Sequence, residues 1–361
     1  MYKTTLRKPD GRLLNLYSSH PIEEGIEATN PVHETFNPAP HQRWHLLRRE
    51  WVIYASHRQD RTFLPPKDYS PLAVTKRRDL PTEMPQGHYE VAVFENLYPS
   101  LNTTTTESPA LSVPTRPSSG ICEVIVFTQN PDTSLGHLPV KRIELILRVL
   151  GERTMELAKF EHIEYVMPFE NRGVEMGVTL HHPHGQIYSY SFIPPVQERF
   201  LESMKKYWIE NQTGLMEKII QDEKQDGRRI ILETENVICF VPIFARYPYE
   251  TWIVPKRRMC FIHEMTDEEF LDFSSVLKAL LLKYDHLWDR PFPYLMTINQ
   301  APVKGHYPYA HFFFQITPPY RSKDRLKYLA GTELGAGVFV NDSLPEEKAR
   351  ELINVEVEDV G

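Results

Sequence analysis

The sequence predicts an α+β protein made of two tandem units, each an antiparallel sheet backed by a helix. Two observations support this class. The order strand, strand, helix, strand, strand occurs twice along the chain, with an offset of about 140 residues that suits duplicated domains. The length of 361 residues and the hydrophobic content of 41% allow a core in each unit. We place the units at residues 1–195 and 196–361, and expect their sheet edges to pair with each other or across a dimer.

The first unit is predicted to contain four strands, from apolar segments, and one amphipathic helix. Its strands are expected at 91–99, 122–127, 163–169 and 182–192, with a helix at 139–159 between the second and third. The helix is indicated by apolar side chains that recur every three or four residues.

The second unit repeats this order. Its strands are expected at 237–242, 251–255, 294–298 and 311–316, with the helix again between the second and third. Thr266 and Glu269 have the spacing of a capping box, in which each side chain accepts a hydrogen bond from the backbone of the other residue. The helix is therefore expected to begin directly after Thr266.

Three histidines fall within four positions, at His181, His182 and His184. Pro183 excludes a helix, and alternate residues of a strand share a face, so His182, His184 and Gln186 are expected to point the same way. An imidazole can attack phosphorus or bind a metal, and a carboxamide can donate an N–H where negative charge develops. A strand with ordinary surface histidines is the alternative, which so specific a motif disfavours.

The histidine motif occurs in the first unit only. Gly185 within it is expected to leave room for a phosphate group, because glycine has no side chain to crowd the approach. The equivalent strand of the second unit reads Tyr-Ala-His-Phe-Phe-Phe-Gln at 309–315. We therefore expect the first unit to react and the second to support or bind, with Phe313 buried in its strand.

Composition limits the class of partner and the compartment. The net charge of −7 comes from intermixed acidic and basic residues, which argues against a nucleic-acid-coating surface. Cys122, Cys239 and Cys260 are odd in number and widely spaced, so they indicate neither a disulfide framework nor a metal knuckle. No run approaches the roughly 18 apolar residues of a membrane span. We expect a cytoplasmic protein without nucleic-acid or membrane partners.

The chain resembles the galactose-1-phosphate uridylyltransferase family of the histidine-triad superfamily over about residues 43–351. The resemblance is carried by Phe-Glu-Asn-Arg-Gly at 169–173, Gly-Val-Thr at 177–179, His-Pro-His-Gly-Gln at 182–186 and Lys-Tyr-Leu-Ala-Gly-Thr-Glu at 327–333. It implies two tandem histidine-triad-like domains and a role in galactose metabolism. It also implies ping-pong transfer of a uridylyl group from UDP-glucose to galactose 1-phosphate through a uridylyl-histidine.

The resemblance assigns roles residue by residue. His184 becomes the nucleophile, with Gln186 and His182 beside it as catalytic residues. Matching positions imply substrate contacts at Arg58, Arg61, Asn96, Asn171, Gly177, Thr179, Lys327, Gly331, Thr332 and Glu333.

Several of these substrate contacts carry a further expectation. The two arginines reach phosphate from the neighbouring subunit in that family, which implies a homodimer; ordinary surface arginines are the alternative. Asn96 matches a nucleotide-binding asparagine, although Leu97 follows it where an aspartate is usual. Asn171 and Thr179 match phosphate-proximal groups and are otherwise turn residues. The late segment, with Thr332 where tyrosine is frequent, would hold the sugar and its phosphate.

The family's metal sites are largely missing from this chain. Many members bind zinc through a Cys-x-x-Cys pair, a further histidine and the first histidine of His-Pro-His, but this chain lacks the pair and has Asp132 near the third position. A second, iron-type site would need a glutamate after the catalytic strand and three later histidines, and Asn299, His311 and Phe313 stand at the histidine positions. We therefore predict no metal and no other cofactor, and expect packing over residues 65–89 to take the place of zinc.

Two other functions stay open. An adenylyltransferase or phosphorylase of the same superfamily would act on ADP-sugars, and Gly185 disfavours it because such relatives often carry serine there. A non-catalytic nucleotide-sugar-binding protein is the second alternative, although binding alone would not require an imidazole directed at phosphorus.

Overall fold

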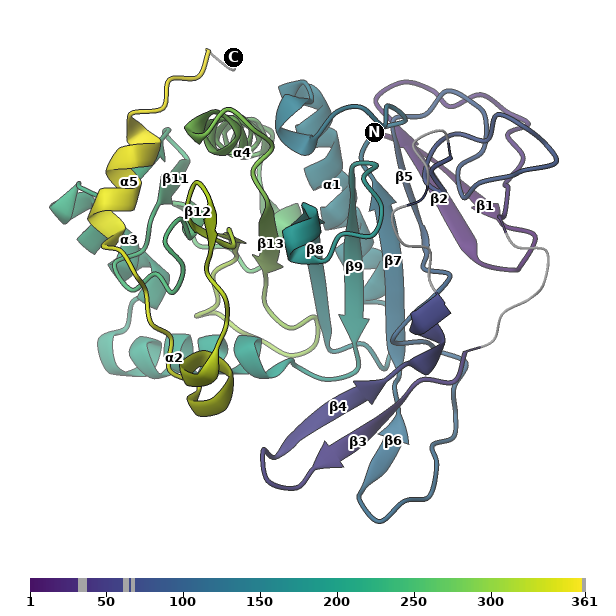
Figure 1. Cartoon of the computed structure of the whole chain (residues 1–361), viewed down its shortest axis with the longest axis horizontal. Helices are drawn as coiled ribbons and strands as arrows, with labels where there is room; N and C mark the ends of the chain where they lie inside the picture. The colour runs from purple at the N-terminus through teal and green to yellow at the C-terminus, as the bar shows by residue number, and fades with distance from the viewer. Residues whose placement is uncertain (32–37, 61–64, 66–68, 359–361) are drawn as a thin grey trace.

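The computed structural model describes residues 1–31, 38–60, 65 and 69–358. Within this part of the chain, one antiparallel sheet of eleven strands runs through the whole molecule in the order β1-β2-β5-β7-β9-β8-β13-β14-β12-β11-β10 (Figure 1). A three-stranded sheet, β4-β3-β6, projects below β7 and β9 in Figure 1, and β15 pairs with β16. The predicted α+β class with two tandem units is confirmed.

The first half of the chain contributes nine strands of these sheets and one long helix. They are β1 Tyr2–Arg7, β2 Leu13–Ser18, β3 His41–His45, β4 Glu50–Tyr54, β5 Val91–Glu95, β6 Thr115–Pro117, β7 Gly120–Val126, α1 Val140–Leu157, β8 Tyr165–Arg172 and β9 His184–Tyr190.

The second half contributes the other helices and strands. They are α2 Pro195–Asn211, α3 Leu215–Asp226, β10 Ile230–Glu233, β11 Val237–Phe240, β12 Thr251–Pro255, α4 Asp267–Leu287, β13 Tyr294–Asn299, β14 Phe313–Thr317, β15 Tyr320–Ser322, β16 Arg325–Leu326 and α5 Pro345–Ile353. The helix predicted after Thr266 begins at Asp267, and Thr266 and Glu269 form the expected capping box.

The predicted repeat is confirmed, and it appears in space as a mirror order of strands. The first copy lies in the order β5-β7-β9-β8 and the second continues as β13-β14-β12-β11. The copies meet where β8 pairs with β13, through Phe169 opposite Thr297 and Glu170 opposite Met296. The expected pairing of sheet edges is thus made within one chain, which removes two exposed edges.

Three strands begin two residues later than predicted. The strands expected at 163–169, 182–192 and 311–316 start at Tyr165, His184 and Phe313, and of the residues before them only His182 and Pro183 form a bend. The hairpin β1–β2, the projecting sheet and the helices α2 and α3 were not predicted. In α3 the apolar residues at 215, 216, 219 and 220 recur at helical spacing, which was a usable signal. The strands of the projecting sheet mix apolar and charged residues without a clean alternation.

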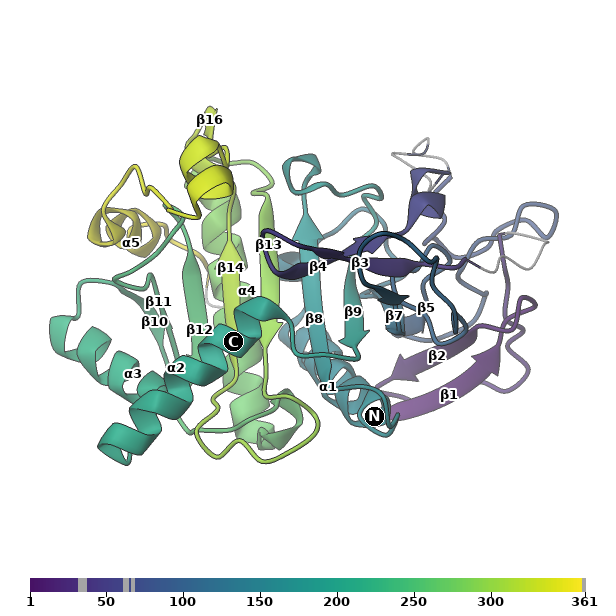
Figure 2. The ribbon, with the colours of Figure 1, turned by 90° about the horizontal axis from the view of Figure 1, so that it is seen from below.

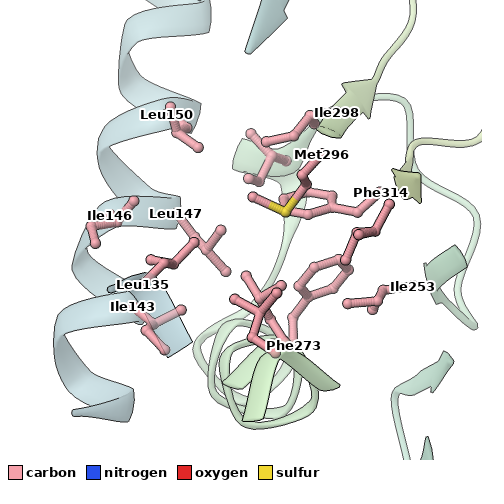
Figure 3. Close-up of a cluster of buried hydrophobic side chains, with 14 of the residues drawn as sticks. Leu135, Ile143, Ile146, Leu147, Leu150, Ile253, Phe273, Met296, Ile298 and Phe314 are labelled. Atoms are coloured by element: carbon pink, nitrogen blue, oxygen red, sulfur yellow. The ribbon is translucent and has the colours of Figure 1, made fainter. Parts of the chain in front are cut away.

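One face of the sheet is covered by α1 and α4. Figure 3 shows Ile143, Leu147 and Leu150 of α1 directed toward Met296 and other buried side chains of the second half. Each such side chain stabilises the fold by roughly 1.5–3 kcal/mol when fully buried. A single core therefore joins the two copies. Among the described residues, no helix is long and apolar enough to cross a membrane.

The opposite face differs between the two halves. Over the second half, α2 and α3 pack on β11, β12 and β14, as Figure 2 shows from below. Over the first half this face is hollowed into a cavity of about 460 Å³. The asymmetry leaves the motif-bearing strand β9 accessible and covers its counterpart, β14.

Candidate active site

The cavity lies over the pocket-facing residues of β9. His184, Gln186 and Tyr188 alternate along this strand and line the cavity, while Gly185, Ile187 and Ser189 are buried on the helix side. This alternation follows from the two-residue period of a strand. The Gln186 carboxamide makes no hydrogen bond to other described residues, so it is available to a ligand.

His184 is held in one tautomer by its own motif. Its Nδ1 lies 2.7 Å from the carbonyl oxygen of His182, and because a carbonyl only accepts, Nδ1 carries the hydrogen and donates it. Burial lowers the pKa of His184 below its usual range. The ring is therefore neutral at pH 7. Because the hydrogen is on Nδ1, Nε2 carries a lone pair.

His182 does not share the face of His184, so that expectation is wrong. It precedes the strand, is 2% exposed and does not line the cavity. Its Nε2 donates to the carbonyl oxygen of Thr128 at 2.7 Å, and its Nδ1 has no partner among the described residues. The bend at Pro183 rotates the residue out of the alternation, and it is the backbone carbonyl of His182 that contacts His184.

Gly185 has a different role from the one expected. A Cβ at this position would lie 3.0 Å from the ring of Phe127 and 3.0 Å from the carbonyl oxygen of Phe169, on the side of the sheet that α1 covers. The glycine therefore permits close packing behind the strand, rather than the approach of phosphate from the front.

Five of the other predicted residues lie around the same cavity: Arg58, Asn96, Asn171, Gly177 and Thr179. Arg58 donates to the carbonyl oxygen of Tyr98 at 2.7 Å, so its guanidinium is fixed at the cavity wall of its own chain. Gly177 follows a helical turn at a φ of 74°, a conformation that favours glycine. Residues 177–180, which follow this turn, contribute to the cavity wall.

The remaining predicted residues do not reach this cavity. Lys327 and Glu333 form a buried ion pair at 3.4 Å, and Gly331 and Thr332 belong to the same turn, Gly331–Ala336. None of the four lines the cavity. Arg61 lies outside the described residues.

Sequence reasoning missed several residues that line the cavity. Tyr188 continues the alternation of His184 and Gln186, which was a usable signal. Tyr69 and Glu83 come from an irregular segment and carry no periodic signal. Only the folded chain brings that segment to the site.

The second copy preserves the frame of the motif without its chemistry. His311 is 3% exposed and donates from Nε2 to the carbonyl oxygen of Pro255 at 2.8 Å, just as His182 bonds Thr128. Two residues later Phe313 takes the place of His184 and lies 4.6 Å from Trp252, ring centre to ring centre. Phe313 is buried as predicted.

The residues at the family's iron-type position do not fit a metal. Gln197 donates to the side-chain oxygen of Asn299 at 3.2 Å, so two amides bond each other, and the phenyl ring of Phe313 offers no donor atom. Among the described residues, no three or more His, Cys, Asp or Glu side chains gather in a way that could hold a metal ion.

Comparison with known proteins gives a consistent result across the chain. Residues 31–194 match the family model for the galactose-1-phosphate uridyl transferase N-terminal domain, and residues 200–360 match the model for its C-terminal domain. The chain is 37% identical to galactose-1-phosphate uridylyltransferase of Thermotoga maritima, over 88% of this chain and 98% of that protein.

Two solved structures are similar to this chain. A uridylyltransferase structure superposes with a TM-score of 0.78 at 30% identity, covering 87% of this chain and 97% of the other. An ADP-glucose phosphorylase from Arabidopsis thaliana, with bound ADP-glucose, superposes with a TM-score of 0.68 at 25% identity, over 88% and 99% of the two chains.

Proposed function

The chain belongs to the galactose-1-phosphate uridylyltransferase family, and we propose that it converts UDP-glucose and galactose 1-phosphate into glucose 1-phosphate and UDP-galactose. It is a nucleotidyltransferase of galactose metabolism. The observation that carries the proposal is the neutral His184, which is the first residue of β9 and lines the cavity, with its Nδ1–H donated to the carbonyl oxygen of His182.

In the first half-reaction, Nε2 of His184 attacks the α-phosphorus of UDP-glucose. A bond forms between nitrogen and phosphorus, and the bond from the α-phosphorus to the bridging oxygen breaks, which releases glucose 1-phosphate. The imidazole becomes positively charged, and the carbonyl oxygen of His182 at 2.7 Å stabilises the Nδ1–H of that cation. Phosphate is a good leaving group, so this step needs no general acid.

In the second half-reaction, a phosphate oxygen of galactose 1-phosphate attacks the same phosphorus. The nitrogen–phosphorus bond breaks, UDP-galactose forms, and His184 returns to its neutral state. Gln186 is proposed to donate N–H to a non-bridging oxygen, where charge increases in both transition states. Arg58, Asn171 and Thr179 would contact the phosphates from the cavity wall.

We propose that the working form is a homodimer and that a second copy supplies the sugar-binding segment. Lys327 and Glu333 do not line the cavity of their own chain. The segment around them exposes apolar side chains, with Tyr328 74% and Leu334 62% exposed, which supports a protein contact there. A monomeric mass with full activity in sedimentation and kinetics at the same concentration would contradict this dimer.

We also propose a cytoplasmic location, which the three free cysteines support. A disulfide detected in protein isolated without reductant would contradict it.

The test compares His184→Gly with His181→Gly, a neighbouring exposed histidine that does not line the cavity. His184→Gly should lose label exchange between UDP-glucose and glucose 1-phosphate by at least about a thousandfold, while still binding UDP-glucose. His181→Gly should exchange normally. Undiminished exchange in His184→Gly would refute the proposal.

Mass measurement of the trapped intermediate separates the alternatives. A uridylyl adduct on the wild-type protein is expected after incubation with UDP-glucose. An adenylyl adduct formed only from ADP-glucose would instead support an activity like that of the Arabidopsis relative. Binding of either sugar nucleotide without any adduct or exchange would indicate a non-catalytic binding protein.

A further inference from the structure

Residues 1–30 lie outside both family models, the first of which begins at residue 31. They are nevertheless an integral part of the sheet. β1 and β2 form an antiparallel hairpin, and β2 pairs with β5 through Leu14 opposite Phe94 and Tyr17 opposite Val91. Five of the six residues of β2 are buried. This hairpin therefore adds to the catalytic half of the molecule rather than trailing from it.

A straight row of cross-strand neighbours leads from the catalytic strand to the hairpin. Gln186 pairs with Val124, Val124 with Phe94, and Phe94 with Leu14. Adjacent strands lie about 4.8 Å apart, so Phe94 is about 10 Å from the strand of Gln186. That is roughly the reach of a nucleoside from its phosphorus to the far edge of its base. Since the first three residues of the row line the cavity, the nucleoside half of the substrate would extend toward the hairpin.

The turn of the hairpin holds a buried carboxylate at this end of the cavity. Glu83 lines the cavity and is 4% exposed. Lys8 contacts it at 2.8 Å and also donates to the carbonyl oxygen of Thr29 at 2.6 Å. Arg12 contacts the same carboxylate at 3.0 Å and Asp10 at 2.7 Å. Both cations belong to the turn that follows β1, and each depends on its partner because all are largely removed from water.

Apolar contacts join the same two parts of the chain. Leu14 and Leu16 of β2 form a buried cluster with Leu72, Met84 and Tyr89. Arg12 also donates to the carbonyl oxygen of Glu95 at 2.8 Å, immediately before the cavity residue Asn96. The hairpin thus contacts the cavity wall at two places, through the side chains of β2 and through Arg12 in its turn.

We propose that the N-terminal hairpin is a positioning element of the nucleotide pocket: through Lys8 and Arg12 it fixes Glu83 and the segment 69–89 against the nucleoside half of the substrate. This inference rests on the proposed function, since it assumes a nucleotide in the cavity. It makes Lys8 a positioning residue, because its ammonium acts through Glu83 and does not line the cavity itself. The same ion pairs join segment 69–89 to the hairpin without a metal.

The test is Lys8→Met, with Lys3→Met as its matched control. Lys3 lies in the same hairpin and also pairs with a glutamate, Glu152, at 2.6 Å, but that pair is at the surface and away from the cavity. Lys8→Met is expected to raise KM for UDP-glucose at least about tenfold and to lower kcat less than about threefold, because His184 keeps its own support. Lys3→Met should leave both constants within about twofold.

A KM for UDP-glucose in Lys8→Met equal to that of Lys3→Met overturns the inference, provided that the wild type exchanges label between UDP-glucose and glucose 1-phosphate. A wild type that takes no uridylyl group overturns the proposed function, and this inference with it. If Lys8→Met does not fold, amide hydrogen exchange of the wild type decides. Saturating UMP should slow exchange at the amides of Gly11, Thr75 and Glu83; protection confined to residues 177–190 would overturn the inference.

Discussion

Gly185→Ala distinguishes two explanations of the glycine in the His-Pro-His-Gly-Gln motif. If the glycine gives phosphate access from the cavity, alanine should lower activity and leave stability unchanged. The structure predicts a loss of stability instead, since a Cβ would meet the Phe127 ring and the Phe169 carbonyl oxygen at 3.0 Å and Ile125 at 3.3 Å. The Phe169 oxygen cannot retreat easily, because β8 is paired on both sides, with β9 and β13.

The expected cost follows from crowding in a packed interior. Overpacking typically costs 1–3 kcal/mol, and the lower entropy of the unfolded alanine chain returns roughly 0.4–1 kcal/mol. We expect a net loss of about 1–2 kcal/mol in the free energy of unfolding. An unfolding entropy of about 2.1 cal/mol/K per residue over 361 residues converts this into a Tm lower by roughly 1–3 °C. Activity should fall as well, because the displaced backbone lies between His184 and Gln186.

Urea unfolding and calorimetry at pH 7.5 measure the change, with Gly335→Ala as control. A Cβ at Gly335 has no neighbour within 4 Å, so this variant lacks the crowding and should be as stable as the wild type or more stable by up to about 1 kcal/mol. A Gly185→Ala protein as stable as the wild type but with reduced kcat/KM would refute the packing argument and restore the phosphate explanation.

Two further predictions concern the buried histidines and metals. Burial lowers the pKa of His311 to about 4, so on acidification the unfolded state binds a proton before the folded state does. As the pH falls from 6.5 to 4, the free energy of unfolding therefore decreases by on the order of 3 kcal/mol. Urea unfolding at several pH values should show a weaker acid dependence for His311→Gln than for the wild type; equal slopes would contradict it. Extensive dialysis against a chelator should leave kcat and Tm unchanged, whereas stoichiometric zinc in the purified protein and inactivation on its removal would show that a metal is required.

The two copies of the repeat show how one scaffold is given two roles. Both retain a buried histidine bonded to a backbone carbonyl, His182 in the first copy and His311 in the second. The first copy then places His184 in an open cavity, and the second places Phe313 under α2 and α3. Within the described residues, the histidine proposed to react lies where no helix covers the sheet, which is consistent with a single reacting half per chain.

The sequence alone was sufficient for the repeat and the fold class, and it selected candidate site residues on the strand that lines the cavity. Apolar periodicity and the capping box at Thr266 located both helices that cover the sheet, because those signals are local. The His-Pro-His-Gly-Gln motif identified His184 and Gln186, since alternation along a strand is fixed by backbone geometry. Resemblance added Arg58, Asn96, Asn171, Gly177 and Thr179, all of which line the same cavity.

Only the tertiary structure decided how these parts are combined. The pairing of β8 with β13 and the burial of His182 depend on contacts between distant segments, which no local period encodes. The packing role of Gly185 appears only when the opposite face of the sheet is filled. Likewise, Lys8 becomes significant because folding brings it 2.8 Å from Glu83, 75 residues away in the chain. Local sequence fixes the direction of a side chain along its strand, but the partner that it meets is set by the three-dimensional path of the chain.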